Sequence, residues 1–378
     1  MRILIITFSK GVNPGTFMQA LGVKTAMNRL YPDAMVEYLN FPDFKKSFGI
    51  KKETDNVKDV ALRKLFGAYR LMKYKRLEKR NFTISKPIDL FDYEDTEAEK
   101  LFAKYDLIVI GSDTILEKAY GEKGKVGLNW MPFDVKKIYF AASASPANFE
   151  PTDDIKKVAS DALYIGLRDN LTIDFFRDKL GIDAKRLNKQ PDPSYYLDVS
   201  KLELPNRLKR KLDTNNKYAL YNFNSNFPYK KELADRLRGL GYVVVSTAYN
   251  PCADICFDTV DAFEWAATFP YMDIIVTERF HDSVFGLRNG KPVIAIDWEK
   301  SRFASEGDSK TYRILEDYNL TELHFNLVMS ADLTPICNAV ENINRLFDPN
   351  KISERNMEIQ QKADKMLDVI KEQIKGRL

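Results

Sequence analysis

His281 is the residue whose type and position point most directly to chemistry. The chain has only two histidines in 378 residues, and this one lies in the segment TERFHDSVFG, after the apolar run DIIV. An imidazole exchanges protons near neutral pH, so a histidine at a strand end can act as general acid or base. In an extended strand, Thr277, Arg279 and His281 would point to one side. We therefore predict that these three meet at a ligand; a histidine hydrogen-bonded within a domain interface is the alternative.

Charged residues near other strand ends suit an anionic ligand. Arg168 follows the apolar run YIGL, where a buried guanidinium needs a negative partner, and its planar fork fits a carboxylate or a phosphate. A bridge to Asp169 or Asp192 would satisfy it as well. Asp282 directly follows His281, in the predicted first helical turn, where the helix dipole favours a carboxylate. It would either repel an anion bound nearby or orient His281.

Two further segments place polar residues where strands end. Gly111, Ser112 and Asp113 follow the run DLIVI, and the glycine permits a sharp turn close to a ligand. Asn13 and Gly15 precede a predicted helix, whose backbone N–H groups favour anions. The segment does not match the G-x-G-x-x-G pattern of dinucleotide sites. Ordinary turns and helix caps would explain both segments equally well.

Composition narrows the classes of function. The net charge of +4 does not indicate a dedicated nucleic-acid binder. Cys252 and Cys256 could begin a zinc site, but no second ligand pair follows, so no metal is expected. The opening MRILIITFSK is too short for a signal sequence and predicts a first strand. No window of about 18 apolar residues could span a membrane, so we expect a cytoplasmic protein.

The elements that must position these residues are short strands alternating with helices. Continuous apolar runs indicate strands buried on both faces of parallel sheets, hence an α/β fold. The runs are RILIITF, MVEYLNF, DLIVIGSD, KIYFAASAS, ALYIGLRD, KYALYNFN, YVVVSTA, DIIVTERF and PVIAIDW. Helical patterns separate many of them, at 16–30, 170–180, 230–240, 262–268 and 282–289. Ligands of such sheets lie beyond the carboxyl ends of the strands.

The polar, proline-containing segment 184–211 divides the runs into two sets and places a boundary near 195–215. We expect a Rossmann-like domain over 1–200, a second over 201–350, and a C-terminal helix over 351–378. The two parallel sheets would face each other across a cleft.

A helical basic insertion is expected at about 45–90. Residues 61–80 carry eight basic residues against one acidic residue, with Leu62, Leu65, Phe66 and Tyr69 at helical spacing. This helix either packs its apolar stripe on the domain or lies on a membrane surface.

The order of these segments resembles the polysaccharide pyruvyl transferase family along most of the chain. The resemblance rests on NPGTFMQALGVKTAM, RNFTISK, DLIVIGSD, YFAASAS, ALYIGLRDNLTIDFFRDKLG, PDPSYYLD, IIVTERFHDSVFGLRNGKPVIAID and DSKTYRILEDYNL. The most specific part is the Thr-x-Arg-x-His strand end followed by a helix, Lys-Pro and an apolar strand. The resemblance implies two Rossmann-like domains arranged as in GT-B glycosyltransferases.

The resemblance also implies a reaction and roles for residues. A pyruvyl group would move from phosphoenolpyruvate to two hydroxyls of a sugar in a surface glycan or its precursor, giving a cyclic ketal and phosphate. His281 would match the active-site histidine, and Arg168, Arg279 and Thr277 would bind the donor, which is a substrate, so no cofactor is expected. The remaining cleft candidates are Asn13, Gly15, Ser112, Asp113, Asp282 and Lys310. The implied acceptor is a sugar or a lipid-linked oligosaccharide, and the basic helix would then touch the inner membrane face peripherally.

Two alternatives remain open. A nucleotide-sugar glycosyltransferase of GT-B type would need cations for a diphosphate, for which Lys300 or Lys310 would serve. A catalytically silent glycan-binding relative is the other, because family members commonly have a small residue where this chain has Asp282. The residues TIL after GSD also depart from the family pattern.

Overall fold

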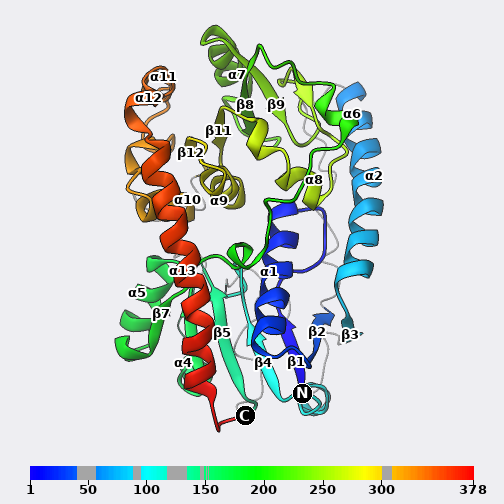
Figure 1. The fold of residues 1–378 in the computed structure, drawn as a ribbon, viewed down its shortest axis with the longest axis vertical. Helices are drawn as coiled ribbons and strands as arrows, with labels where there is room; N and C mark the ends of the chain where they lie inside the picture. The colour runs from blue at the N-terminus through cyan, green and yellow to red at the C-terminus, as the bar shows by residue number, and fades with distance from the viewer. Residues whose placement is uncertain are drawn as a thin grey trace.

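Two parallel β-sheets with the same strand order form the frame of the molecule (Figure 1). The computed structural model describes residues 1–40, 57–87, 95–116, 134–144, 149, 151, 153–299 and 309–378. Lys300, one of the cations named above, lies outside the described residues, as do the parts 45–56 and 88–90 of the predicted insertion. The last strand of the first sheet ends at Lys189 and the first strand of the second begins at Lys217, so the predicted division at 200 lies between them.

The first sheet has the order β3-β2-β1-β4-β5-β6-β7, with every pair parallel. Its strands are β1 Arg2–Ile6, β2 Met35–Asn40, β3 Ile84–Pro87, β4 Leu107–Ile110, β5 Lys137–Ala142, β6 Tyr164–Leu167 and β7 Leu187–Lys189. The order reverses between β1 and β4, which opens a crevice beyond their carboxyl ends.

The second sheet repeats the pattern with the order β10-β9-β8-β11-β12-β13, again parallel throughout. Its strands are β8 Lys217–Asn222, β9 Tyr242–Ser246, β10 Ile255–Cys256, β11 Ile274–Thr277, β12 Val293–Asp297 and β13 His324–Asn326. Here the order reverses between β8 and β11. The predicted α/β architecture with two parallel sheets is confirmed.

All nine predicted strands are present, and the four further strands in the described ranges, which were not predicted, are all sheet edges. β3 and β7 border the first sheet, and β10 and β13 border the second. Central strands such as β4 and β5 are buried at every residue, which requires a continuous apolar run. An edge strand is short and half covered, so its sequence carries no such run.

The helices that connect the strands include the five that were predicted. The helices are α1 Pro14–Leu30, α3 Asp95–Phe102, α4 Asp153–Ser160, α5 Asn170–Asp178, α6 Asn206–Lys209, α7 Lys230–Gly239, α8 Ala262–Ala266, α9 Phe280–Arg288, α10 Lys310–Asp317, α11 Thr334–Glu341 and α12 Ile343–Leu346. The α9 helix begins at Phe280, two residues before the predicted start. The expectation of an extended strand through His281 is therefore wrong, because that residue lies in the first helical turn.

Each sheet and the helices that cover it form one lobe, the first lobe around the first sheet and the second lobe around the second sheet. Two long helices connect these lobes, α13 Pro349–Ile374 and α2 Val57–Asn81 (Figure 1). The predicted C-terminal helix is confirmed as α13, which contacts α1 and β6 of the first lobe and α9 of the second. The α2 helix reaches the second lobe through Lys73, whose ammonium lies 2.6 Å from Glu264 of α8. Among the described helices, none combines the length and apolarity needed to span a bilayer.

The apolar stripe predicted for residues 61–80 is divided between two faces of α2. Phe66 turns inward and stacks on Tyr249, with ring centroids 5.9 Å apart. Leu65 and Tyr69 point outward, with exposed fractions of 64% and 46%. The helix is therefore docked on the second lobe and still presents apolar side chains to solvent.

Candidate functional site

A buried ion pair at the carboxyl edge of the first sheet organises the site. Arg168 directly follows β6, and its Nη1 lies 3.2 Å from Oδ2 of Asp192. Its Nη2 donates to the hydroxyl of Ser143 at 2.9 Å. Asp192 in turn accepts the backbone N–H of Ser194 and begins the short 3-10 turn η5, Pro193–Tyr196. Of the two bridges considered for Arg168, the one to Asp192 is formed, while Asp169 caps α5.

The charges around Asp192 keep it ionised. Burial alone would raise its pKa, but contact with His281 and the charges of His281 and Arg168 outweigh burial and hold the pKa well below its ordinary value. The Arg168 guanidinium also lies over the ring of Phe280, 4.2 Å from its centroid. Its Nε is buried and has no hydrogen-bond partner among the described residues.

His281 lies beside this ion pair, and its Nε2 makes no hydrogen bond among the described residues. Its Nε2 lies 3.7 Å from Oδ2 of Asp192, longer than a hydrogen bond. That nitrogen is buried and finds no hydrogen-bond partner in the described part of the chain. Buried polar atoms are almost always hydrogen-bonded in proteins, so an orphan at a sheet edge indicates a ligand or water partner.

Gly15 leaves the space that the imidazole occupies. A Cβ at this position would lie 2.3 Å from Cβ and 2.5 Å from Nδ1 of His281, closer than real contacts allow. Gly15 is in the first turn of α1, so the first lobe presses directly on the histidine of the second. The glycine thus serves a close side-chain approach, and no ligand contact is needed to explain it.

Asp113 brings a second carboxylate toward His281. Its backbone is in the left-handed region with φ 67°, and its Oδ2 accepts the hydroxyl of Thr16 at 3.2 Å. Burial raises the pKa of Asp113, but the charges of His281, Arg168 and Lys310 lower it by more than burial raises it. The net pKa therefore lies below the ordinary value. The predicted candidates His281, Arg168, Asp113 and Lys310 therefore act on one another electrostatically.

Asp282 turns away from His281 into the second lobe. Its Oδ2 accepts hydrogen bonds from Asn222 at 2.9 Å and Thr277 at 3.0 Å, and its Oδ1 accepts the indole N–H of Trp265 at 3.2 Å. Burial raises its pKa despite these contacts. Asp282 thus connects the ends of β8 and β11 to α8 through hydrogen bonds. Thr277, which is fully buried, belongs to this hydrogen-bond network.

Two more candidates occupy structural positions. Ser112 is buried, donates its hydroxyl to Gln19, and accepts the hydroxyl of Thr7 at its carbonyl. Asn13 caps α1 by accepting the backbone N–H of Thr16 at 3.2 Å, and it is exposed. The cap alternative therefore describes Asn13, whereas Ser112 is held by hydrogen bonds to distant segments.

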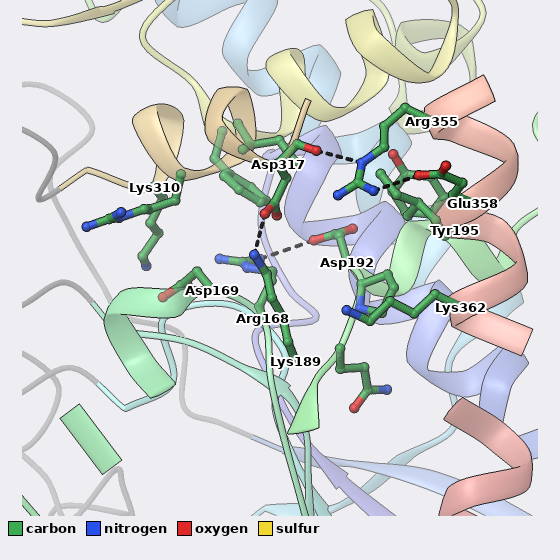
Figure 2. A pocket seen from close by; sticks show the side chains of 16 residues that line it. Arg168, Asp169, Lys189, Asp192, Tyr195, Lys310, Asp317, Arg355, Glu358 and Lys362 are labelled. Atoms are coloured by element: carbon green, nitrogen blue, oxygen red, sulfur yellow. Dashed lines mark hydrogen bonds and ion pairs between the residues drawn. The ribbon is translucent and has the colours of Figure 1, made fainter. Parts of the chain in front are cut away.

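Arg168 lines a cavity of about 160 Å³ that lies between the lobes (Figure 2). We term it the Arg168 cavity. Its basic lining residues come from both lobes and from α13: Arg168, Lys189, Lys310, Arg313, Arg355 and Lys362. Several are already neutralised. Lys189 pairs with Asp317, and Arg355 lies 2.7 Å from Glu358. Lys310 lies in the N-terminal turn of α10 and lines the cavity.

Arg279 lines a different cavity of about 240 Å³, which we term the Arg279 cavity. It lies at the carboxyl ends of β8 and β9 and is closed by α2. Arg279, Phe280 and His281 are consecutive, yet Arg279 lines this cavity, Phe280 lines the Arg168 cavity, and His281 contacts Asp192. The expected convergence of Thr277, Arg279 and His281 on one point is therefore wrong, because the chain turns into a helix at this point.

Sequence reasoning missed the central role of Asp192. This residue was considered only as a partner for Arg168, although it lies in the quoted segment PDPSYYLD. Asn222 was not considered, because an amide at a strand end carries no strong chemical signal. Its Nδ2 donates to Asp282, and its Oδ1 accepts the backbone N–H of Thr247 at 3.0 Å.

Comparison with known proteins places the chain. A family model described as polysaccharide pyruvyl transferase matches residues 13–300. No curated protein matches the chain. UDP-GlcNAc 2-epimerase from Neisseria meningitidis superposes with a TM-score of 0.58 at 9% identity, covering 99% of both chains. The corresponding enzyme of Methanocaldococcus jannaschii gives 0.53 at 12%, covering 90% of this chain and 92% of that one. A glycosyltransferase from Rickettsia africae gives 0.51 at 13%, covering 99% of both.

At these identities the solved structures show the fold alone. Both the shared strand order of the two sheets and the superposition on two-domain proteins along nearly the whole chain confirm a GT-B-like arrangement.

Gly15→Ala is expected to displace the His281 ring, because the added methyl overlaps it. Overpacking of this kind costs roughly 1–3 kcal/mol of unfolding free energy. Histidine-selective NMR measures the displacement, since the chain has two imidazoles and His324, held by Asp297, is an internal reference. The His281 signal should shift and the His324 signal should not. An unchanged His281 signal would contradict the packing described.

Asp282→Ala is expected to destabilise the fold without moving His281. The substitution leaves three donors without their acceptor, which costs on the order of 3 kcal/mol. Urea denaturation measures the loss, and Asp198→Ala, at an exposed carboxylate, is the matched control. A shift of the His281 NMR signal with little loss of stability would instead show that Asp282 orients the histidine.

Proposed function

The chain belongs to the polysaccharide pyruvyl transferase family, and from this premise we propose that it moves a pyruvyl group from phosphoenolpyruvate to two hydroxyls of a sugar. The products are a cyclic ketal and phosphate, and the sugar is part of a surface glycan or its precursor. The proposal is supported above all by one observation. The buried Nε2 of His281 has no hydrogen-bond partner among the described residues and lies beside the Arg168–Asp192 pair at the interface of the lobes.

The donor carries about three negative charges, so its site needs cations that are fixed in place. Arg168 is held by Asp192, Ser143 and Phe280, which leaves its buried Nε for a further acceptor. Arg279 is the N-cap residue of α9 and lines the other cavity. In this proposal Arg168 takes an anionic group of the donor beside His281, Lys310 contributes charge from the second lobe, and Arg279 is left for a ligand of its own cavity.

The reaction needs one proton delivered and two removed. A proton adds to the methylene carbon of phosphoenolpyruvate, and a sugar hydroxyl oxygen bonds to the adjacent carbon while losing its own proton. The carbon–oxygen bond to phosphate then breaks, the second hydroxyl oxygen bonds to the same carbon, and its proton leaves with phosphate. His281 is suited to shuttle protons because an imidazole can both donate and accept a proton.

The two carboxylates of the cluster have different parts in this scheme. Asp192 stays ionised and stabilises the imidazolium form of His281 after it gains a proton. Asp113, whose pKa is also lowered, is an acceptor for the hydrogen of an attacking hydroxyl. No cofactor enters the scheme, because phosphoenolpyruvate brings its own leaving group.

His281→Ala should lower phosphate release from phosphoenolpyruvate by about a hundredfold to ten-thousandfold, the usual contribution of a general acid or base. Phosphate is measured with a panel of sugar acceptors, and circular dichroism checks the fold. Phosphoenolpyruvate should still raise the melting temperature of His281→Ala, whereas Arg168→Gln should lose that shift. Exposed Arg177→Gln is the control for the arginine.

Near-normal phosphate release by His281→Ala contradicts the proposed role. The nucleotide-sugar alternative is tested in the same assay, because the similar Neisseria meningitidis epimerase was solved with UDP-GlcNAc. A melting temperature raised by a sugar nucleotide and not by phosphoenolpyruvate would favour the glycosyltransferase.

We propose also that the outer face of α2 holds the protein at an anionic membrane surface. Leu65, Tyr69 and Met72 are exposed at i, i+4 and i+7 on this helix. The exposed bases around them are Lys64, Lys75, Arg76, Lys79 and Arg80. Apolar side chains flanked by cations are the pattern of helices that lie in the headgroup region, and the cytoplasmic leaflet has the matching negative charge.

Replacing Lys75, Lys79 and Arg80 together by Gln should weaken binding to phosphatidylglycerol-containing vesicles at least tenfold, since each base contributes about 1 kcal/mol near such a surface. Cosedimentation measures the binding, and pure phosphatidylcholine vesicles should bind neither protein. The matched control replaces Lys179, Lys185 and Lys201, which are exposed elsewhere. Equal loss in both triple variants would show that net charge alone is responsible.

A further inference from the structure

We propose that the Arg279 cavity is a second anion site, which binds the phosphate groups of a sugar diphosphate ester. That this ester is the acceptor of the pyruvyl group rests on the proposed function; the anion site itself does not. The cavity is lined by four basic residues against one acidic residue, Asp258, among the described residues. The four are Arg63, Arg70, Lys230 and Arg279. The Arg168 cavity, by contrast, has four carboxylates among its lining residues.

Arg70 is the strongest single indication of an anionic ligand. Its Nη2 donates to the carbonyl of Val12 at 3.2 Å, but its Nε is buried and has no hydrogen-bond partner in the described chain. Burial lowers its pKa and the charge of Arg279 lowers it further, while contact with the Tyr74 hydroxyl and the charge of Asp258 oppose the effect. Two guanidinium groups are thus brought together with little compensating charge, an arrangement that an anion relieves.

The position of the cavity suits a substrate that must reach His281. Arg279 is two residues before His281, and Val12, on the same cavity wall, is three residues before the Gly15 that packs on the imidazole. The cavity also lies beyond the carboxyl ends of β8 and β9, next to the point where the strand order of the second sheet reverses. A ligand anchored here by phosphate can extend a sugar toward the histidine.

The α2 helix completes the cavity from the first lobe. Arg63, Phe66 and Arg70 recur at i, i+3 and i+7 and face inward, so one helical face forms the wall. Phe66 stacks on Tyr249, which in turn donates to Asp59 at 2.7 Å and holds the helix against the second lobe. The outward face of the same helix carries Leu65 and Tyr69, so a membrane-bound lipid diphosphate and a soluble nucleotide sugar both offer the required chemistry.

Calorimetry with inorganic pyrophosphate on the full chain tests the proposal. The wild-type protein should bind it, and Arg70→Gln and Lys230→Gln should each weaken the affinity tenfold or more. Within the described part of the chain, the Lys230 ammonium donates one hydrogen bond, to the carbonyl of Ser225, so its variant remains informative if Arg70→Gln folds poorly. Lys362→Gln, in the Arg168 cavity, is the matched control and should bind as wild type.

The proposal would be overturned if the wild-type protein did not bind pyrophosphate, if the affinity were unchanged in both variants, or if the affinity were lost in Lys362→Gln. Loss of the phosphoenolpyruvate-induced melting shift in Arg70→Gln would also overturn it, because the cavity would then belong to the donor. Pyrophosphate binding without any phosphate release from phosphoenolpyruvate would refute the proposed reaction and leave this site standing.

Competition identifies the source of the diphosphate. Displacement of pyrophosphate by UDP-N-acetylglucosamine assigns a soluble nucleotide sugar, and displacement by vesicles that carry polyprenyl diphosphate assigns a lipid-linked one. Displacement by neither contradicts the proposed ligand class.

Discussion

The buried ion pair between Arg168 and Asp192 is the interaction on which the architecture of the site depends. Either charge alone would be costly to bury, so each requires the other to stay in place. The turn that Asp192 begins also contacts the second lobe. Arg288 of α9 donates a hydrogen bond to the Ser194 carbonyl of this turn at 2.7 Å. Tyr196 of the turn donates to the Ala363 carbonyl of α13 at 3.0 Å. One short turn therefore fixes the first sheet, the α9 helix and the C-terminal α13 helix together.

The α1 helix can approach this turn because two positions on its inner face lack side chains. At Gly22 a Cβ would lie 2.1 Å from the Pro193 carbonyl oxygen, and at Gly15 it would overlap His281. The two glycines are seven residues apart, hence on the same face of the helix. The two lobes thus meet where the backbone of α1 lies close to the Pro193 carbonyl and to the His281 side chain. This packing limits the positions of the His281 ring, whose Nε2 faces Asp192.

Separation of the anion sites follows from the helical start of α9. If residues 277–281 were extended, both arginines would share one pocket with His281. Instead Arg279 lines the Arg279 cavity and Arg168 lines its own, so the two arginines lie in separate cavities on either side of His281. The α2 helix contributes to this division, because its inner face lines one site while its outer face remains available for a surface.

The sequence by itself determined the class of the fold and the identity of the principal candidates. Strands buried on both faces must be apolar throughout, so nine of them were readable, whereas the edge strands were not. His281 and Arg168 stood out because an imidazole or a guanidinium at a strand end is unusual. Only the tertiary structure decided between Asp169 and Asp192 as the partner of Arg168, and gave Asp282 a place in the second lobe. These outcomes depend on contacts between distant segments, such as Asp282 with Asn222, whose geometry local periodicity does not encode.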